Sequence, residues 1–141
     1  MIQPSGKATI SLRREIRSSL AEIHLLCAEI RALLLAANLE NAAFATELLA
    51  RESLCNGAIH GNMGNLDKKV SLEICADQTG VCLQVTDEGN GFNWRTQCSA
   101  LRESDSVSGR GIHLYALYAD RMEFNEIGNQ ITLWISTKAN A

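Results

Sequence analysis

Two pairs of alternating segments constrain the fold of this chain more than any other sequence feature. Apolar and polar side chains alternate on both sides of the turn Gln78-Thr79-Gly80, and again on both sides of Gly128-Asn129. Alternation across a short turn is typical of a β-hairpin, so the pattern predicts two antiparallel hairpins. The four predicted strands are residues 70–77, 81–86, 122–127 and 131–135.

Helical spacing dominates the sequence before the first hairpin. Residues 7–13 alternate and predict an opening strand, after which apolar residues recur every three or four positions. This spacing predicts a helix over residues 16–38 and a second over residues 41–60, capped by Asn41. A shorter helix is expected over residues 110–120. The expected buried stripes are Ile16, Leu20, Ile23, Cys27, Ile30, Leu34 and Ala37 in the first helix, and Phe44, Leu48, Cys55 and Ile59 in the second.

The order of these elements predicts the architecture. Strands outnumber the connections that could cross the sheet, so neighbouring strands must be mostly antiparallel. We expect an α+β fold, a two-layer α/β sandwich with a mixed, mostly antiparallel sheet and helices on one face. The chain has 141 residues and no repeat or linker, so residues 1–141 should form a single domain.

Composition excludes several classes of protein. Charged residues make up 21% of the chain, the formal net charge is -3 and no basic stripe occurs, so nucleic acid is not an expected partner. No apolar run is long enough to span a bilayer and no signal-peptide pattern is visible, so we expect a cytoplasmic protein without membrane contacts. The five cysteines lack the paired short spacings of structural zinc sites and are expected to be reduced thiols.

Polar residues recur every four positions in the second predicted helix. Glu52, Asn56 and His60 would follow one side of it, with Glu52 on or beside the buried stripe. A buried carboxylate usually pairs, binds a metal or reacts. The simpler interpretation is that Glu52 lies at the margin and pairs with a nearby Arg or Lys, and that His60 merely ends the helix.

Two glycine motifs follow. Asp87 ends a predicted strand on the face of its core residues, and Gly89 and Gly91 after it permit close approach of a ligand. Gly109-Arg110-Gly111 precedes the third predicted helix, whose N-terminus would offer free N–H groups to a phosphate. Taken alone, each motif is equally consistent with a glycine-rich turn or a flexible loop.

In this order, the three motifs resemble the nucleotide-binding fold of the GHKL superfamily, which includes gyrase, MutL and the histidine kinases. The segment Glu52-Ser-Leu-Cys-Asn56-Gly-Ala-Ile-His60-Gly61 is similar to the first motif of a small single-domain branch, the anti-sigma factor serine/threonine kinases. Gly109-Arg110-Gly111-Ile112, followed by an aliphatic-rich helix, is similar to a later motif. The chain departs from the family pattern at Gly57, where alanine is usual, and at Asn129, where threonine is usual.

The resemblance implies a role for each motif residue. Asn56 would bind the Mg²⁺ that bridges the phosphates of ATP, and Glu52 would act as the base toward the attacking hydroxyl. Asp87 would accept a hydrogen bond from the adenine amino group. Gly89 and Gly91 would allow the base to lie close, Gly109, Arg110 and Gly111 would cradle phosphates, and residues 93–108 would form a lid over the nucleotide.

The function that the resemblance implies is that of an ATP-dependent serine/threonine protein kinase and anti-sigma regulatory factor. Its substrate would be a STAS-domain anti-anti-sigma protein, and a sigma factor and a second copy of the chain, in a homodimer, would be further partners. The alternative is a switch module that binds ATP, or only a partner, without turnover. A histidine kinase is disfavoured, because His24 lies in a helix that belongs to the nucleotide-binding fold itself.

Overall fold

The computed structural model describes residues 10–91 and 107–137, the second range with side chains from residue 113 onward. The first residues of the predicted opening strand, and residues 93–106 of the predicted lid, lie outside this description. The elements in chain order are β1 (Ile10–Arg17), α1 (Leu20–Ala36), α2 (Glu40–Cys55), η1 (Asn56–Gly61), β2 (Lys69–Ala76), β3 (Gly80–Asp87), α4 (Val107–Tyr118), β4 (Arg121–Phe124) and β5 (Gln130–Ser136).

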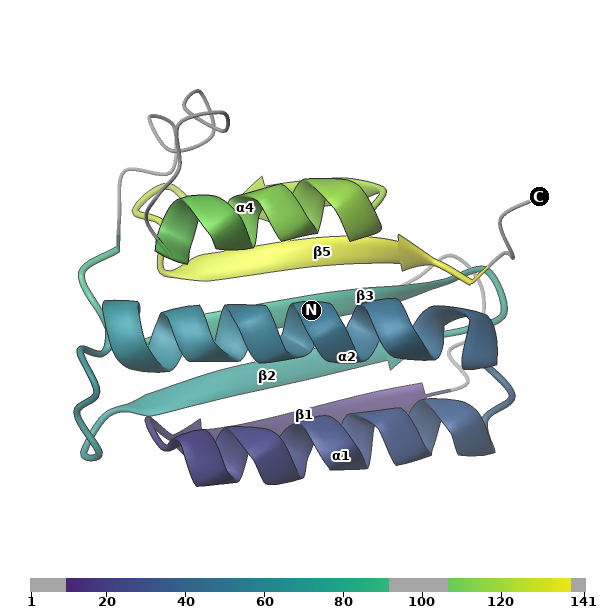
Figure 1. The fold of residues 1–141 in the computed structure, drawn as a ribbon, viewed down its shortest axis with the longest axis horizontal. Coiled ribbons are helices and arrows are strands. Elements are labelled where there is room, and N and C mark those ends of the chain that lie inside the picture. Colours follow the sequence, from purple (N-terminus) through teal and green to yellow (C-terminus); the bar gives the residue numbers. More distant parts are fainter. Residues whose placement is uncertain (1–9, 92–106, 138–141) are drawn as a thin grey trace.

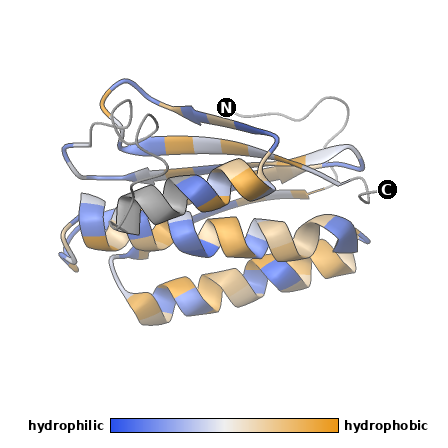
Figure 2. Ribbon diagram, turned by 45° about the horizontal axis from the view of Figure 1, so that its top comes forward, coloured by the Kyte–Doolittle hydropathy of each residue, from blue (hydrophilic) through white to orange (hydrophobic). Residues whose placement is uncertain are grey.

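Five strands form one sheet in the order β1-β2-β3-β5-β4, which confirms the predicted α+β architecture. Every pair of neighbouring strands in it is antiparallel. The two predicted hairpins are β2–β3 and β4–β5, and the pairing of β3 with β5 joins them. α1, α2 and α4 lie side by side on one face of this sheet (Figure 1), and an oblique view shows helices and strands as two layers (Figure 2). In the two described ranges, no helix has both the length and the apolar character needed to cross a membrane.

The hydrophobic core lies between the two layers. Alternate residues of the strands face the helices, and a register slip of one residue would turn all of them away from the core. Burying one such side chain fully contributes about 1.5–3 kcal/mol, so the register is strongly specified. Asp87, the last residue of β3, has the same parity as these core residues. The fully buried strand residues on this face include Val70, Leu72, Ile74, Val81, Leu83 and Leu133.

The boundary between β1 and α1 differs from the prediction. Ile16 pairs with Val70 in the sheet instead of starting the helix. Ser19 caps α1 with its side chain, so the helix begins at Leu20, which is 61% exposed. The last apolar residue of a strand and the first of the next helix are four positions apart here, and periodicity alone cannot separate them. The central members of the predicted stripe, Ile23, Cys27, Ile30 and Leu34, are buried as predicted.

The predicted buried face of α2 is wrong. Phe44 is 67% exposed and Ile59 46%, while Leu48 and Cys55 are only partly buried. α2 is the middle helix, with α1 and α4 on either side of it (Figure 1), so small side chains on its inner face allow close packing. The helix also starts ahead of the predicted cap, Asn41. The residues that α2 buries are Ala42, Ala43, Thr46, Leu49, Ala50, Ser53 and Leu54.

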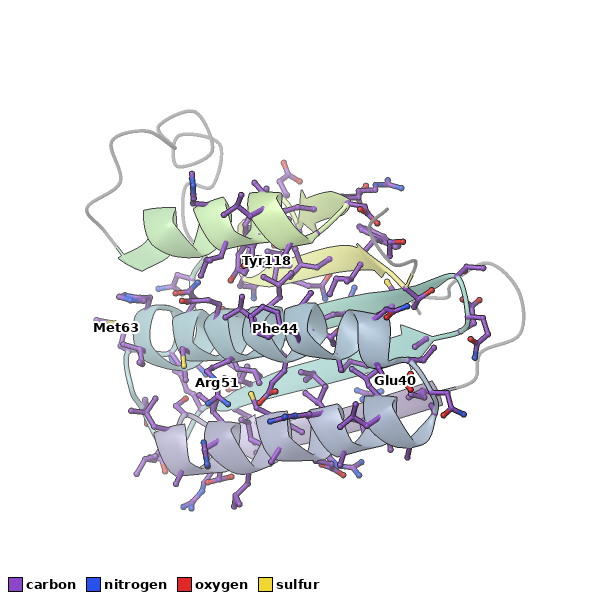
Figure 3. All side chains as sticks on the ribbon, turned by 45° about the vertical axis from the view of Figure 1, so that its right-hand side comes forward. Glu40, Phe44, Arg51, Met63 and Tyr118 are labelled. Atoms are coloured by element: carbon purple, nitrogen blue, oxygen red, sulfur yellow. The ribbon has the colours of Figure 1, made fainter. Side chains whose placement is uncertain are left out.

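An aromatic contact holds α4 beside α2. The rings of Phe44 and Tyr118 meet edge to face with their centroids 5.9 Å apart (Figure 3). Pairs in this geometry contribute about 0.5–1.5 kcal/mol beyond the area that they bury. Tyr115, one turn earlier on α4, is buried, and its hydroxyl reaches the end of α2. The contact between the helices therefore also fixes one side of the candidate site.

Candidate functional site

A pocket opens where α2 ends, between the end of β3 and the turn that joins β4 to β5. The cavity itself measures about 90 Å³ and opens to solvent at its mouth. Asn56, Asp87 and Gly91, all predicted site residues, lie on its wall. Val85 and Ile131 add apolar surface from the sheet. The pocket thus combines an apolar part with polar groups from opposite sides.

The end of α2 widens into a single π-helical turn, η1. The N–H of Asn62 donates to the carbonyl of Gly57, five residues back, at 2.7 Å. Turns of this kind are rare and are frequently found at functional sites. The predicted α-helical spacing as far as His60 is therefore wrong from Asn56 onward. His60 is exposed and borders the pocket.

The carboxylate of Asp87 lies against the two glycines of η1. A Cβ atom on Gly61 would lie 2.5 Å from both carboxylate oxygens, and one on Gly57 would lie 3.3 Å from the Cβ of Asp87. Position 61 therefore leaves room for Asp87 only when it is glycine. Alanine at position 57, which the resembled motif has, would be a tighter contact than usual but would need only a small shift of Asp87 and Val70.

Burial also changes the ionisation of Asp87. The loss of solvent raises the pKa of its carboxyl above the ordinary value, and a hydrogen bond and the charge of Lys68 offset part of this rise. The hydrogen bond comes from the Gly89 N–H, which donates to Oδ1 at 2.7 Å. A partly desolvated carboxylate at the wall of a pocket is a strong acceptor for a ligand N–H.

Asn129 ties the turn between β4 and β5 to the end of β3. Its carbonyl accepts the Asp87 N–H at 2.9 Å, and its Nδ2 donates to the Asp87 carbonyl at 3.1 Å. Its Oδ1 accepts from Nδ2 of Asn125 at 2.5 Å. Both ends of the Asn129 amide, at the position where the resembled motif has threonine, are therefore hydrogen-bonded within the protein. The bond to the Asp87 carbonyl helps to hold the backbone of Asp87 in place.

Gly89 and Gly91 lie where backbone segments touch. A Cβ atom on Gly89 would lie 2.6 Å from the carbonyl carbon of Gly61, and one on Gly91 would lie 2.6 Å from that of Ile127. Gly91 also has a φ of +86°, which disfavours any other residue. Close backbone packing is therefore one reason for glycine at both positions, and the approach of a base to them stays a prediction. Of the two, Gly91 lines the pocket.

On the opposite wall, Asn56 uses only one end of its amide. Its Nδ2 donates to the hydroxyl of Tyr115 at 3.0 Å. Its Oδ1 is buried, and no described group donates to it. An unsatisfied buried acceptor costs about 1–3 kcal/mol, and an amide oxygen is a suitable ligand for a hard cation such as Mg²⁺. The residues present therefore fit the cation that the sequence analysis expected at Asn56.

Glu52 lies one turn before Asn56 on α2 and is partly buried. It is not among the described residues that line the pocket. No described residue forms an ion pair with it, and the adjacent Arg51 pairs instead with Glu47 at 3.4 Å. The simpler interpretation, a structural ion pair, therefore has no partner in the described part of the chain.

The third motif is helical in the structure. α4 begins at Val107, so Gly109-Arg110-Gly111 lies inside the helix and the predicted start at residue 110 is wrong. A glycine costs about 1 kcal/mol in a helix interior, which is too little to stop a helix. Gly109 lies in the first turn, where N–H groups have no partner within the helix, whereas Gly111 lies beyond it. The side chain of Arg110 is outside the described residues.

Sequence reasoning missed two residues that build the site. Tyr115 carries no motif and cannot be told from a core aromatic. Asn62 follows the glycine that ends η1, and it is buried. Its Oδ1 accepts the Glu88 N–H at 2.8 Å, and its Nδ2 donates to the Lys69 carbonyl at 3.0 Å. Asn62 thereby joins η1 to the start of β2 and the end of β3, which no local pattern could have indicated.

Comparison with known proteins agrees with this geometry. A family model described as a histidine kinase-like ATPase domain matches residues 11–135, which extend from β1 into β5. The match includes all three predicted motifs. No curated protein sequence matches the chain.

Proposed function

Because the chain belongs to the histidine kinase-like ATPase family, we propose that it is an ATP-dependent serine/threonine protein kinase and anti-sigma regulatory factor. Its substrate would be a STAS-type anti-sigma-antagonist protein. One observation supports the nucleotide site most: a single pocket is lined both by Asp87 and by Asn56, whose Oδ1 is buried and accepts no hydrogen bond from the described residues. A sigma factor and a second copy of the chain are the further partners that we propose.

In the proposed complex, the adenine of ATP would lie near Asp87 and its phosphates near Asn56. Asp87 would accept a hydrogen bond from the adenine amino group, with Val85 and Ile131 offering apolar contact to the base. Asn56 would hold the Mg²⁺ that accompanies the phosphates. When bound, this ion supplies positive charge that offsets the charge on the phosphates. The free N–H groups at the start of α4, including that of Gly109, would receive phosphate oxygens.

Glu52 is the proposed general base. In the reaction, the hydroxyl oxygen of a substrate serine or threonine forms a bond to the γ-phosphorus of ATP. The bond from that phosphorus to the oxygen bridging to the β-phosphate breaks, and ADP leaves. The proton of the hydroxyl passes to the Glu52 carboxylate. Proton transfer of this kind contributes about 10²–10⁴-fold in rate.

The test separates binding from transfer. Titration calorimetry with Mg²⁺ and a non-hydrolysable ATP analogue should show binding to the wild type, and Asn56→Ala should lose either the binding or its dependence on Mg²⁺. A wild type that binds no nucleotide would refute the proposal. With γ-labelled ATP and a STAS-domain protein, Glu52→Ala should lose about 10²–10⁴-fold in transfer rate and keep its nucleotide affinity. Unchanged transfer in this variant would remove Glu52 from the reaction.

One observation favours a second candidate, a switch module that binds nucleotide or a partner without turnover. Glu52 is partly buried, and none of the described pocket surface belongs to it. Under this alternative, the wild type and Glu52→Ala would bind the ATP analogue and the STAS-domain protein equally well, and neither would transfer phosphate.

A further inference from the structure

The amide of Asn56 can serve a cation in only one of its two orientations. An asparagine amide has a donor end and an acceptor end, and only the oxygen can bind a cation. The two ends are treated differently here, because Nδ2 donates to the Tyr115 hydroxyl at 3.0 Å while Oδ1 is buried with no described partner. The hydrogen bond on one end therefore determines what the other end presents.

Tyr115 has the properties needed to fix this orientation. Its side chain is 2% exposed, so it does not move freely into solvent. A tyrosine hydroxyl is uncharged at neutral pH, and its oxygen can accept the Asn56 N–H.

We propose that Tyr115 is a positioning residue for the cation of the bound nucleotide, because it accepts the Asn56 amide N–H and so leaves Oδ1, which accepts no hydrogen bond from the described residues, as the end that can bind the cation. The inference rests on the proposed nucleotide-binding function. Partners that orient a metal ligand typically contribute about 10–100-fold to metal affinity. A tyrosine that merely filled the core would instead affect stability, or affect all binding equally.

The chain offers a matched control. It contains two tyrosines, and the second, Tyr118, lies three residues later on the same helix against Phe44. We would titrate a non-hydrolysable ATP analogue into the wild type, Tyr115→Phe and Tyr118→Phe, once with Mg²⁺ and once with EDTA. In Tyr115→Phe, the ratio of the two affinities should fall by about tenfold or more, while the affinity in EDTA stays unchanged. Tyr118→Phe should keep the ratio of the wild type.

Other results would overturn the inference. If Tyr115→Phe keeps the wild-type ratio, or loses affinity equally in Mg²⁺ and EDTA, Tyr115 does not orient the ligand. If the wild type binds no nucleotide at all, the proposed function fails first and the inference fails with it. If the wild type binds the ATP analogue but Tyr115→Phe has the same ratio of affinities in Mg²⁺ and EDTA, the proposed function stands and the inference alone is refuted.

A second measurement tests the inference even if Tyr115→Phe fails to fold. In Tyr118→Phe protein labelled with 3-fluorotyrosine, Tyr115 carries the single fluorine label. Its ¹⁹F resonance should shift when the analogue binds with Mg²⁺ and not when it binds in EDTA. The absence of a Mg²⁺-specific shift would overturn the inference without any need for Tyr115→Phe.

Discussion

The two walls of the pocket treat their polar groups differently. The sheet side consists of the end of β3 and the turn between β4 and β5. There, the Asn129 amide donates to the Asp87 carbonyl and accepts from Asn125, and the Gly91 backbone packs against that of Ile127. On the helical side, at the end of α2, Asn56 Oδ1 is buried and accepts no hydrogen bond from the described residues. A satisfied network makes a wall rigid, whereas an unsatisfied acceptor costs stability that only a ligand can recover. The polar groups of the sheet side are therefore satisfied within the protein, whereas the helical side keeps the acceptor that we propose for the cation.

The largest effect should come from breaking the sheet side. In Gly91→Ala, the new Cβ atom would collide with the Ile127 backbone, and a φ of +86° is unfavourable for alanine. Strain and overpacking together should reduce the free energy of unfolding by about 3 kcal/mol or more, measured by urea denaturation. Gly64→Ala is the matched control, since Gly64 has a φ of +71° and open space around it. Strain alone should cost this control about 1–2 kcal/mol.

Equal losses of stability in the two variants would contradict this view of the sheet side. The contact between Gly91 and Ile127 would then add nothing to the backbone strain that both glycines relieve. A larger loss in Gly91→Ala than in Gly64→Ala, together with weaker nucleotide binding, would show that the packed backbone also shapes the pocket.

Most of the fold could be predicted from the sequence, because large apolar residues alternate with polar or smaller ones along the strands. Alternation located both hairpins, and the parity of Asp87 with Val81, Leu83 and Val85 is also found in the structure. The helices were harder. α2 is enclosed by two helices and the sheet, so it buries alanine, serine and threonine while Phe44 stays exposed. An apolar stripe predicts the buried face of a helix that packs on one side only, whereas α2 packs against the sheet and against two helices.

Only those residues of the candidate site that belong to sequence motifs could be predicted. The sequence indicated Asn56 and Asp87, which do meet at one pocket. It could not indicate the π-helical turn between them, because the bond from Asn62 to Gly57 depends on how η1 packs on Asp87. Tyr115 was missed for a similar reason. It acts through a hydrogen bond to a residue 59 positions away, and such contacts exist only in three dimensions.

An intermediate effect should come from changing the boundary between the two walls. In Gly61→Ala, the Cβ atom would occupy the space of the Asp87 carboxylate, which is a side-chain terminus and can rotate away. Nucleotide affinity should therefore fall by roughly 10–100-fold, the loss of a hydrogen bond to a charged group, with a stability change of about 1 kcal/mol. Calorimetric titration with the ATP analogue measures the affinity, and thermal unfolding monitors the fold.

Gly57→Ala is the control for this prediction. Its Cβ atom would meet Asp87 and Val70 at 3.3 Å, so a shift of a few tenths of an ångström accommodates it. It should keep most of the nucleotide affinity. If both alanine variants bind like the wild type, the carboxylate of Asp87 does not contact the nucleotide.

The smallest effect should be on the pH dependence of stability, which we expect to differ between variants at Asp87 and at Asp77. Burial raises the pKa of Asp87 in the folded state above its ordinary value of 3.8, so its stabilising contribution is complete below pH 3.8 and is lost as the pH rises through the folded-state pKa. Asp87→Asn does not titrate, so its stability relative to the wild type should increase as the pH is raised from about 3.8 to 7. Urea midpoints across this range measure the difference.

Asp77, at the other end of the β2–β3 hairpin, supplies a control of opposite sign. Hydrogen bonds from Thr79 and Gly80 lower the pKa of its carboxyl, so its stabilising contribution is present above pH 3.8 and is lost as the pH falls through the folded-state pKa. Asp77→Asn should therefore lose stability relative to the wild type as the pH rises. If both variants changed in the same direction, Asp87 would be a solvated turn residue like any other. Opposite slopes would mean that the sheet side of the pocket holds its carboxylate at a cost in stability, which an adenine amino group bound to it would offset.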